Sequence, residues 1–154
     1  VLPLDDATLR RELSHRIPER AEQHDTAVRL AAGSLGRAVQ ACTERAVQLH
    51  DLVRAVLATT NGLRPLATAS AVLQGARELR AAGEAARTFL WLLRAELRAR
   101  SSGLAAASAG SYPAPAAEPW TTWLESTLAA ERDLDLLIPP EQVLTACLLD
   151  LRSA

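Results

Sequence analysis

Hydrophobic residues recur every three or four positions along most of this chain, which is the spacing of helices with one buried face. In residues 1–43 this spacing predicts three short helices. The first has Leu9, Leu13 and Ile17 on its apolar face, and it follows Asp5 and Asp6, either of which suits its N-cap. The three helices are expected to end near Pro18, at Gly33 and near Thr43.

From about residue 44 the apolar spacing becomes stronger, and it predicts a larger helical bundle. One buried stripe, at positions i, i+3, i+4, i+7 and i+8, consists of Leu49, Leu52, Val53, Val56 and Leu57. A helix over 66–82 is expected to end at Gly83, and the next helix, over 84–100, contains the apolar run 89–93, Phe-Leu-Trp-Leu-Leu. Because this run covers every side of a helix, its centre is predicted to be the innermost part of the bundle.

Small residues, glycine and proline dominate residues 101–118, where a flexible surface loop is predicted. Pro119 suits the first turn of a following helix, and Pro139 and Pro140 suit the start of the last one. The apolar faces of these two helices are expected to be Trp120, Trp123, Leu124 and Leu128, and then Leu144, Cys147, Leu148 and Leu151. The chain is therefore predicted to be all-α, with a small three-helix domain over 1–43 and a helical-bundle domain over 44–154.

The composition of the 154 residues excludes several kinds of chemistry. All 17 basic residues are arginine, so the chain has no lysine for a phosphate loop, a Schiff base or a general base. The net charge of −1 argues against a dedicated nucleic-acid clamp. Methionine is absent and the chain begins Val-Leu-Pro-Leu, which suggests a piece of a longer protein. Without a signal peptide or the roughly 18 consecutive apolar residues of a membrane span, a cytoplasmic protein that does not contact membranes is expected.

Residues that could carry metal or redox chemistry are few and scattered. His15, His24 and His50 share no metal-ligand spacing and are expected on the surface. Cys42 and Cys147 form no Cys-x-x-Cys pair, and because both lie among small apolar residues they are expected to be buried thiols. No catalytic residue, metal site or cofactor is therefore predicted.

Charge is distributed unevenly along the bundle domain. Residues 76–100 hold six arginines against three glutamates, a net +3, and residues 118–154 hold two arginines against seven acidic residues, a net −5. Such helices can pair with each other or with neighbouring subunits. A third interpretation is that both helix faces are solvated and that their scattered ion pairs contribute little to stability. Asp133 and Asp135 have no partner cluster for magnesium or for acid–base work, and they suit a solvated helix end.

The most informative segment is 29–40, Arg-Leu-Ala-Ala-Gly-Ser-Leu-Gly-Arg-Ala-Val-Gln. It predicts a helix stop at Gly33, an N-cap at Ser34 and a new helix in which Gly36 and Ala38 are small enough for another backbone to approach. The pattern A-x-G-S-x-G-x-A, at the end of a three-helix unit, resembles the second-sensor segment in the lid of clamp-loader subunits of the AAA+ class. It is most similar to the delta-prime family of bacterial DNA polymerase III.

The likeness continues on both sides of this segment. The opening Leu2-Pro-Leu-Asp-Asp is similar to the start of the lid domain, which follows a nucleotide-fold domain in that family. The run 89–93 with its trailing arginines, the loop after it and residues 130–152 are similar, in order and length, to parts of the family's C-terminal collar domain. The resemblance implies a lid over 1–43 and a collar over 44–154, cut from a longer chain at a domain boundary.

One departure from the wider clamp-loader pattern concerns the nucleotide. In the ATP-hydrolysing subunits, the residue two after the motif serine is an arginine that reaches the nucleotide phosphates. Here that position is Gly36, and the arginine comes one residue later, at Arg37. One residue turns a side chain by about 100° around a helix, so Arg37 is not expected to reach the same point. Gly33, Ser34, Gly36 and Arg37 thus imply a degenerate sensor, as in a non-hydrolysing subunit.

The function that the resemblance implies is structural. The collar would assemble with the other clamp-loader subunits into the pentameric ring that loads the sliding clamp on primed DNA during replication. The expected contact surfaces are the acidic C-terminal helices and an arginine stripe consisting of Arg80, Arg87, Arg94 and Arg98. The core, by contrast, is expected to include Phe89, Trp91, Trp120 and Trp123. Two alternatives stay open: a fragment of an ATP-hydrolysing clamp-loader subunit, and an unrelated helical adaptor in which Gly-Ser-x-Gly is only a helix junction.

Overall fold

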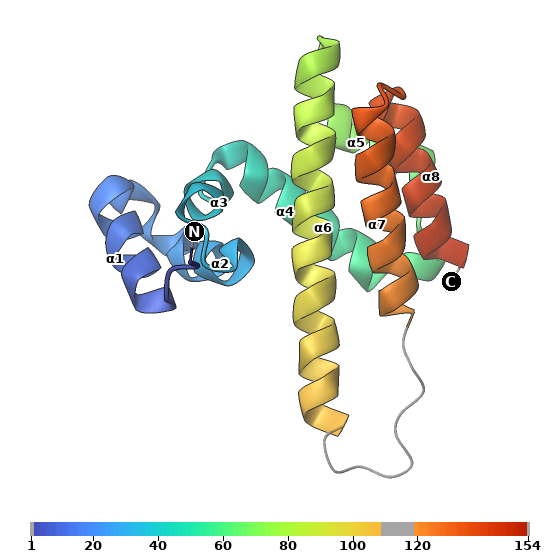
Figure 1. The fold of residues 1–154 in the computed structure, drawn as a ribbon. Helices are drawn as coiled ribbons and strands as arrows, with labels where there is room; N and C mark the ends of the chain where they lie inside the picture. The colour runs from blue at the N-terminus through green and yellow to red at the C-terminus, as the bar shows by residue number, and fades with distance from the viewer. Residues whose placement is uncertain (1, 109–118, 154) are drawn as a thin grey trace. The chain divides into compact units, whose positions relative to one another are not determined.

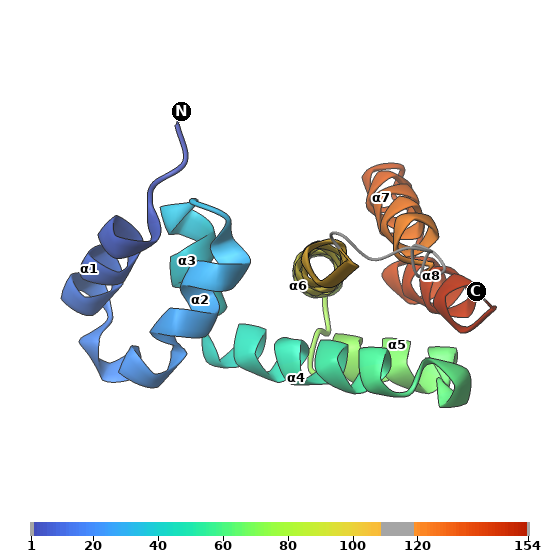
Figure 2. The same ribbon diagram turned by 90° about the horizontal axis from the view of Figure 1, so that it is seen from below.

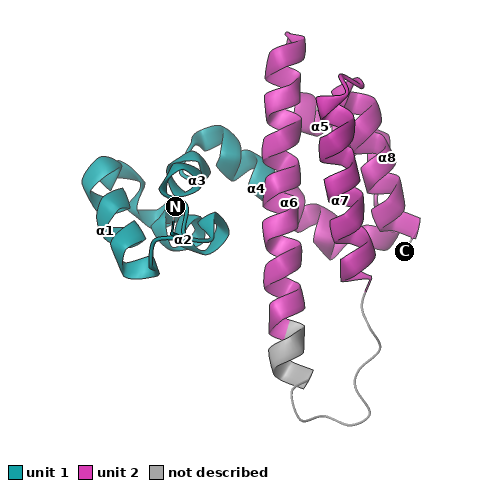
Figure 3. Cartoon of the chain, in the orientation of Figure 1, with its two compact units in different colours: residues 1–50 teal, residues 51–154 magenta. Residues whose placement is uncertain are grey.

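A computed structural model describes residues 2–108 and 119–153, and of residues 104–108 the backbone only. In these two ranges all regular structure is helical, with eight α-helices and two short 3₁₀ helices (Figure 1, and from below in Figure 2). The predicted all-α fold is therefore confirmed. The chain divides into two compact units, residues 1–50 and 51–154 (Figure 3).

The first unit is a set of short helices around an aliphatic core. Its three complete α-helices, which pack on one another, are α1 (Asp6–Arg16), α2 (His24–Ala31) and α3 (Leu35–Ala41). A 3₁₀ helix over Pro18–Gln23 links α1 to α2. The N-cap of α1 is Asp5, whose carboxylate accepts the Thr8 backbone N–H at 2.8 Å, as predicted. The side chains that contribute most to the core are Leu9, Leu13, Val28, Leu30 and Leu49.

The second unit is a bundle of longer helices. Its complete α-helices are α5 (Pro65–Leu73), α6 (Leu79–Ser108), α7 (Trp120–Asp135) and α8 (Pro140–Ser153). Helix α6 packs against α5 and α7, and α8 packs against α5 and α7. All five side chains of the run 89–93 are buried, which confirms that this run lies in the core. Helix α8 begins at Pro140 and buries the four residues predicted for its stripe.

Helix α4 (Glu44–Ala58) is continuous across the division between the two units, which falls after His50. Its predicted stripe is confirmed at four positions, because Leu49, Val53, Val56 and Leu57 are buried and Leu52 is half-buried. The chain thus leaves the first unit and enters the second within one helix. The assignment of the two parts as lid and collar stays a prediction.

The break between α5 and α6 lies earlier than predicted. Helix α5 ends at Leu73, and Gly75 then adopts a left-handed conformation with φ of 82°. Helix α6 begins at Leu79 and runs through Gly83, where a helix stop was predicted. A glycine inside a helix costs only about 1 kcal/mol relative to alanine, so the burial of the following apolar run outweighs it. A left-handed residue after a helix end, by contrast, favours glycine strongly.

Helix α6 also extends into the predicted loop. Residues 101–108 are helical, whereas a flexible loop was expected over 101–118. The segment contains Ala105, Ala106 and Ala107, and alanine has the highest intrinsic helix propensity, which compensates for Gly103. The remainder of the expected loop, 109–118, lies outside the described residues.

The buried face of α7 is rotated from the predicted one. Trp123 is buried, Trp120 and Leu124 are half-buried, and the rings of the two tryptophans meet edge to face at a centroid distance of 5.2 Å. Leu128, however, is exposed, while Thr127 is fully buried. The Thr127 hydroxyl donates to the Leu124 carbonyl at 2.7 Å, so this polar side chain is buried without losing a hydrogen bond.

Candidate functional site

The predicted sensor-like segment forms the junction between α2 and α3. Ala32 and Gly33 both have left-handed backbones, with φ of 47° and 83°, and together they end α2. Ser34 is extended, and its Oγ accepts the Arg37 backbone N–H at 3.4 Å. The helix stop and the serine N-cap predicted from the sequence are therefore confirmed.

The close backbone approach at this junction occurs at Gly33. A Cβ atom on Gly33 would lie 2.3 Å from Pro3 Cβ, and the Leu4 backbone N–H donates to the Gly33 carbonyl at 2.9 Å. Gly36 was predicted to permit such an approach, which is wrong: nothing lies within 4 Å of a Cβ placed there. Gly36 is exposed on the outer side of α3, whereas its neighbour Ala38 is fully buried.

A shallow pocket of about 470 Å³ lies at the junction, lined by residues 2–4 and 32–35. None of these seven lining residues carries a charge. A nucleotide phosphate in this pocket would therefore meet no guanidinium group from the lining. Arg37 is exposed on α3 and is not part of the lining.

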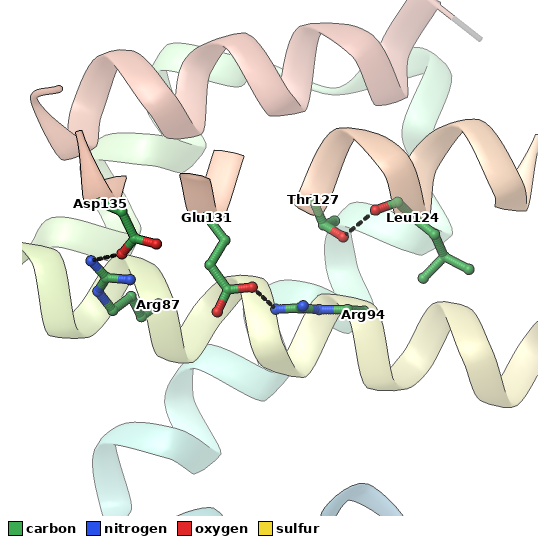
Figure 4. Close-up of polar contacts among 6 residues, drawn as sticks. All are labelled: Arg87, Arg94, Leu124, Thr127, Glu131 and Asp135. Atoms are coloured by element: carbon green, nitrogen blue, oxygen red, sulfur yellow. Dashed lines mark hydrogen bonds and ion pairs between the residues drawn. The ribbon is translucent and has the colours of Figure 1, made fainter. Parts of the chain in front are cut away.

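Two members of the arginine stripe form ion pairs with α7 (Figure 4). Arg87 Nη2 lies 2.8 Å from Asp135 Oδ1, and Arg94 Nη2 lies 2.8 Å from Glu131 Oε2. The Arg94 side chain is only 13% exposed, so its pair is screened less by solvent than the Arg87 pair. The basic and acidic helices thus pair with each other within the second unit, one of the interpretations left open by the sequence.

The two ends of the stripe are arranged differently. Arg80 forms an exposed pair with Glu84 one turn along α6, with 3.3 Å between Arg80 Nε and Glu84 Oε1. Arg98 is also exposed. A surface pair of this type contributes little to stability, so the charges at the two ends of the stripe are exposed to solvent.

The histidines differ from the prediction. His15 is exposed, but His24 and His50 are buried. The His24 Nε2 atom lies 2.9 Å from the Ile17 carbonyl oxygen, a hydrogen bond across the turn that follows α1, which allows the ring to be buried. Within the described ranges no three His, Cys, Asp or Glu side chains gather as metal ligands.

Both cysteines are buried free thiols, as predicted. Burial raises the pKa of Cys42, and it raises the pKa of Cys147 from 9.0 to about 11. Because the thiolate is the nucleophile, we expect the native chain to react very slowly with a disulfide reagent at pH 8 and rapidly once it is denatured. In native protein the reaction of Cys147 should accelerate only near pH 11. Rapid modification of both thiols in native protein at pH 8 would contradict this burial.

The raised thiol pKa also gives a pH dependence of stability. The folded state holds the Cys147 proton more tightly than the unfolded chain does. The contribution of this thiol to the free energy of unfolding is therefore fully present below about pH 9 and is lost as the pH rises toward 11. Urea unfolding of the wild type and of Cys147→Ala between these pH values measures the effect. The wild type should lose more stability than the variant over this interval.

A second pocket was not predicted from the sequence. It lies at one end of the second unit, between the first turns of α6 and the α7–α8 turn. The only sequence signal is the apolar run Leu136-Leu137-Ile138 immediately after the last acidic residue of α7. This run alone does not indicate a pocket, because the exposure of apolar side chains after a helix end depends on how the helices pack.

No helix in the described part of the chain is both long enough and apolar enough to cross a membrane. Comparisons with protein-family models, with curated proteins and with solved structures find no match to this chain.

Proposed function

We propose that this chain is the lid and collar part of a non-hydrolysing clamp-loader subunit, similar to the delta-prime family of bacterial DNA polymerase III. Its function would be to assemble with the other clamp-loader subunits into the ring that loads the sliding clamp on primed DNA. Residues 1–43 would be the lid and residues 44–154 the collar. The chain itself would bind no nucleotide and would reach the clamp and DNA only through its partners.

The junction between α2 and α3 is the observation that carries this proposal. Gly33 supplies the left-handed turn and Ser34 the N-cap, which is the local geometry that the Gly-Ser-x-Gly pattern requires. Gly36 stands at the position of the phosphate-sensing arginine of the ATP-hydrolysing subunits, and the adjacent pocket is lined by uncharged residues. Both features favour a subunit that does not respond to the γ-phosphate.

Assembly is the direct test. The chain is mixed at micromolar concentration with the other clamp-loader subunits of its own organism, and the mixture is separated by size exclusion with light scattering. We expect co-elution in a defined complex. Elution of the chain by itself would favour the unrelated helical adaptor, and ATP hydrolysis by a longer parent chain alone would favour the ATP-hydrolysing alternative.

Arg98→Glu should weaken this assembly by about tenfold or more, because it reverses an exposed charge of the arginine stripe. The fold should be unaffected, since the side chain is exposed. Arg64→Glu is the matched control, because it makes the same charge change at an exposed position of the same unit, just before α5. Equal effects of the two variants would show that only net charge matters and that the stripe is not a contact surface.

A further inference from the structure

The second pocket has a volume of about 450 Å³ and a mainly apolar lining. The apolar lining residues are Leu79 at the start of α6, Leu134 in α7, and Leu137, Ile138 and Pro140 at the α7–α8 turn. Two of them are largely exposed: Leu79 is 69% exposed and Leu137 is 82% exposed. This end of the unit therefore presents large apolar side chains beside an apolar depression.

Leu137 occupies a position at which leucine is unfavourable. The Leu137 N–H donates to the Leu134 carbonyl at 3.1 Å and the Ile138 N–H donates to the Asp133 carbonyl at 3.2 Å, which are the two hydrogen bonds of a Schellman motif. The first residue after the C-cap of this motif is left-handed, and here it is Leu137, with φ of 62°. Glycine is the preferred residue at this position because a Cβ is disfavoured in that conformation. Leu137 thus combines backbone strain with an exposed apolar side chain.

Within residues 2–108 and 119–153 neither cost is compensated. The left-handed turn does not require leucine, and at 82% exposure the side chain buries little apolar surface. If the same side chain entered an apolar pocket of another molecule, removing its apolar surface from water would stabilise the complex. Strain and exposure at one residue are what a side chain that inserts into a partner would combine.

The charges around the pocket point to the partner. Arg80 and Arg87 line it together with Glu84, and Asp135 pairs with Arg87 at the rim. These two cations and two carboxylates, three of them on α6, flank the apolar lining, and their charges sum to zero. A rim of this kind is complementary to itself, because across a two-fold axis the cation of one copy can face the carboxylate of the other.

We propose that this face binds a second copy of the chain in a two-fold symmetric dimer. Leu137 of each copy enters the pocket between α6 and the α7–α8 turn of the other copy. In a two-fold interface the same projection and the same depression are used twice, so one leucine and one pocket per chain complete the contact. The dimer shares Arg80 and Arg87 with the arginine stripe of the proposed assembly but uses neither Arg98 nor the α2–α3 junction, so it can be tested on the chain alone, without the other clamp-loader subunits.

Sedimentation equilibrium of the full chain over a range of micromolar concentrations tests this dimer. We expect a reversible monomer–dimer equilibrium in the wild type. Leu137→Gly should raise the dimer dissociation constant by about tenfold or more, because it deletes the inserted side chain. The same variant should raise the midpoint of thermal unfolding when measured at a concentration where the wild type is monomeric, since glycine relieves the left-handed strain.

Leu66→Ala is the matched control, because it also shortens an exposed leucine of the second unit but lies outside the pocket. It should leave the dissociation constant nearly unchanged. A wild type that stays monomeric, or a dimer that Leu66→Ala weakens as much as Leu137→Gly, would overturn the proposal. So would a Leu137→Gly variant that dimerises normally. If Leu137→Gly instead abolishes only co-elution with other clamp-loader subunits, the occupant of the pocket is one of them and the second copy is ruled out.

Discussion

Replacing Phe89 by alanine is expected to lower the free energy of unfolding of the second unit by about 3–5 kcal/mol. Phe89 is fully buried in α6, at the start of the apolar run that lies in the core. The substitution removes the largest fully buried side chain among the described residues and leaves a cavity that the surrounding helices can only partly fill. Urea unfolding measures the loss, and hydrogen exchange should locate the reduced protection in α6, α7 and α8.

Two control variants test whether the loss of stability comes from lost core packing. Phe89→Leu keeps most of the buried volume, so its cost should be below about 1.5 kcal/mol. Leu66→Ala shortens an exposed residue, and its effect should stay within about 0.5 kcal/mol. A Phe89→Ala variant as stable as Leu66→Ala would show that α6 is not packed as described.

Gly33→Ala is expected to destabilise the first unit by about 2–3 kcal/mol. A left-handed conformation costs an L-residue roughly 1–2 kcal/mol, and loss of the Leu4 N–H bond to the Gly33 carbonyl adds about 0.5–1.5 kcal/mol. The new Cβ would also collide with Pro3, so the segment before α1 must leave its place. Hydrogen exchange should show rapid exchange at the Leu4 amide, and urea unfolding should show the loss of stability.

Gly36→Ala provides the matched comparison, because the two glycines stand three positions apart at the same junction. At Gly36 a Cβ meets open space within α3, so alanine should be neutral or should stabilise the unit by up to about 1 kcal/mol. Similar losses in the two variants would contradict the assignment of the close approach to Gly33.

Most helices could be predicted from the sequence, because leucine spacing and capping residues act locally. Asp5 and Ser34 accept backbone N–H groups as predicted, and Pro140 begins its helix. Such local signals could not decide which of the two glycines near α6 ends a helix. Gly75 and Gly83 have similar sequence surroundings, and only the burial of the residues that follow decides that one ends a helix and the other lies inside one.

The burial of certain polar residues could not be predicted from the sequence either. His24 and Thr127 were placed on the surface or left out of the core, yet each is buried with a hydrogen bond to a backbone carbonyl. A sequence gives the polarity of a side chain, but the partner that offsets its burial depends on a turn or a helix register formed only on folding.

The candidate site was predictable in part for the same reason. The junction at Ser34 is a local feature, so its cap and its turn were confirmed, although the glycine that permits close approach was assigned wrongly. The ion pairs of Arg87 and Arg94 depend on how α6 and α7 pack together, which charge counts cannot specify. The pocket beside Leu137 depends on a left-handed residue at a turn where the sequence has no glycine.

The edge-to-face pair of Trp120 and Trp123 lies in the second unit, and the other chromophores are in that unit as well. All the aromatic residues, three tryptophans, one tyrosine and one phenylalanine, lie in residues 51–154, and residues 1–50 contain none. Tryptophan emission therefore reports on the second unit alone, while the far-ultraviolet circular dichroism signal reports on the helices of both. Recording the two signals in one denaturation experiment separates the unfolding of the two units without labels or truncation.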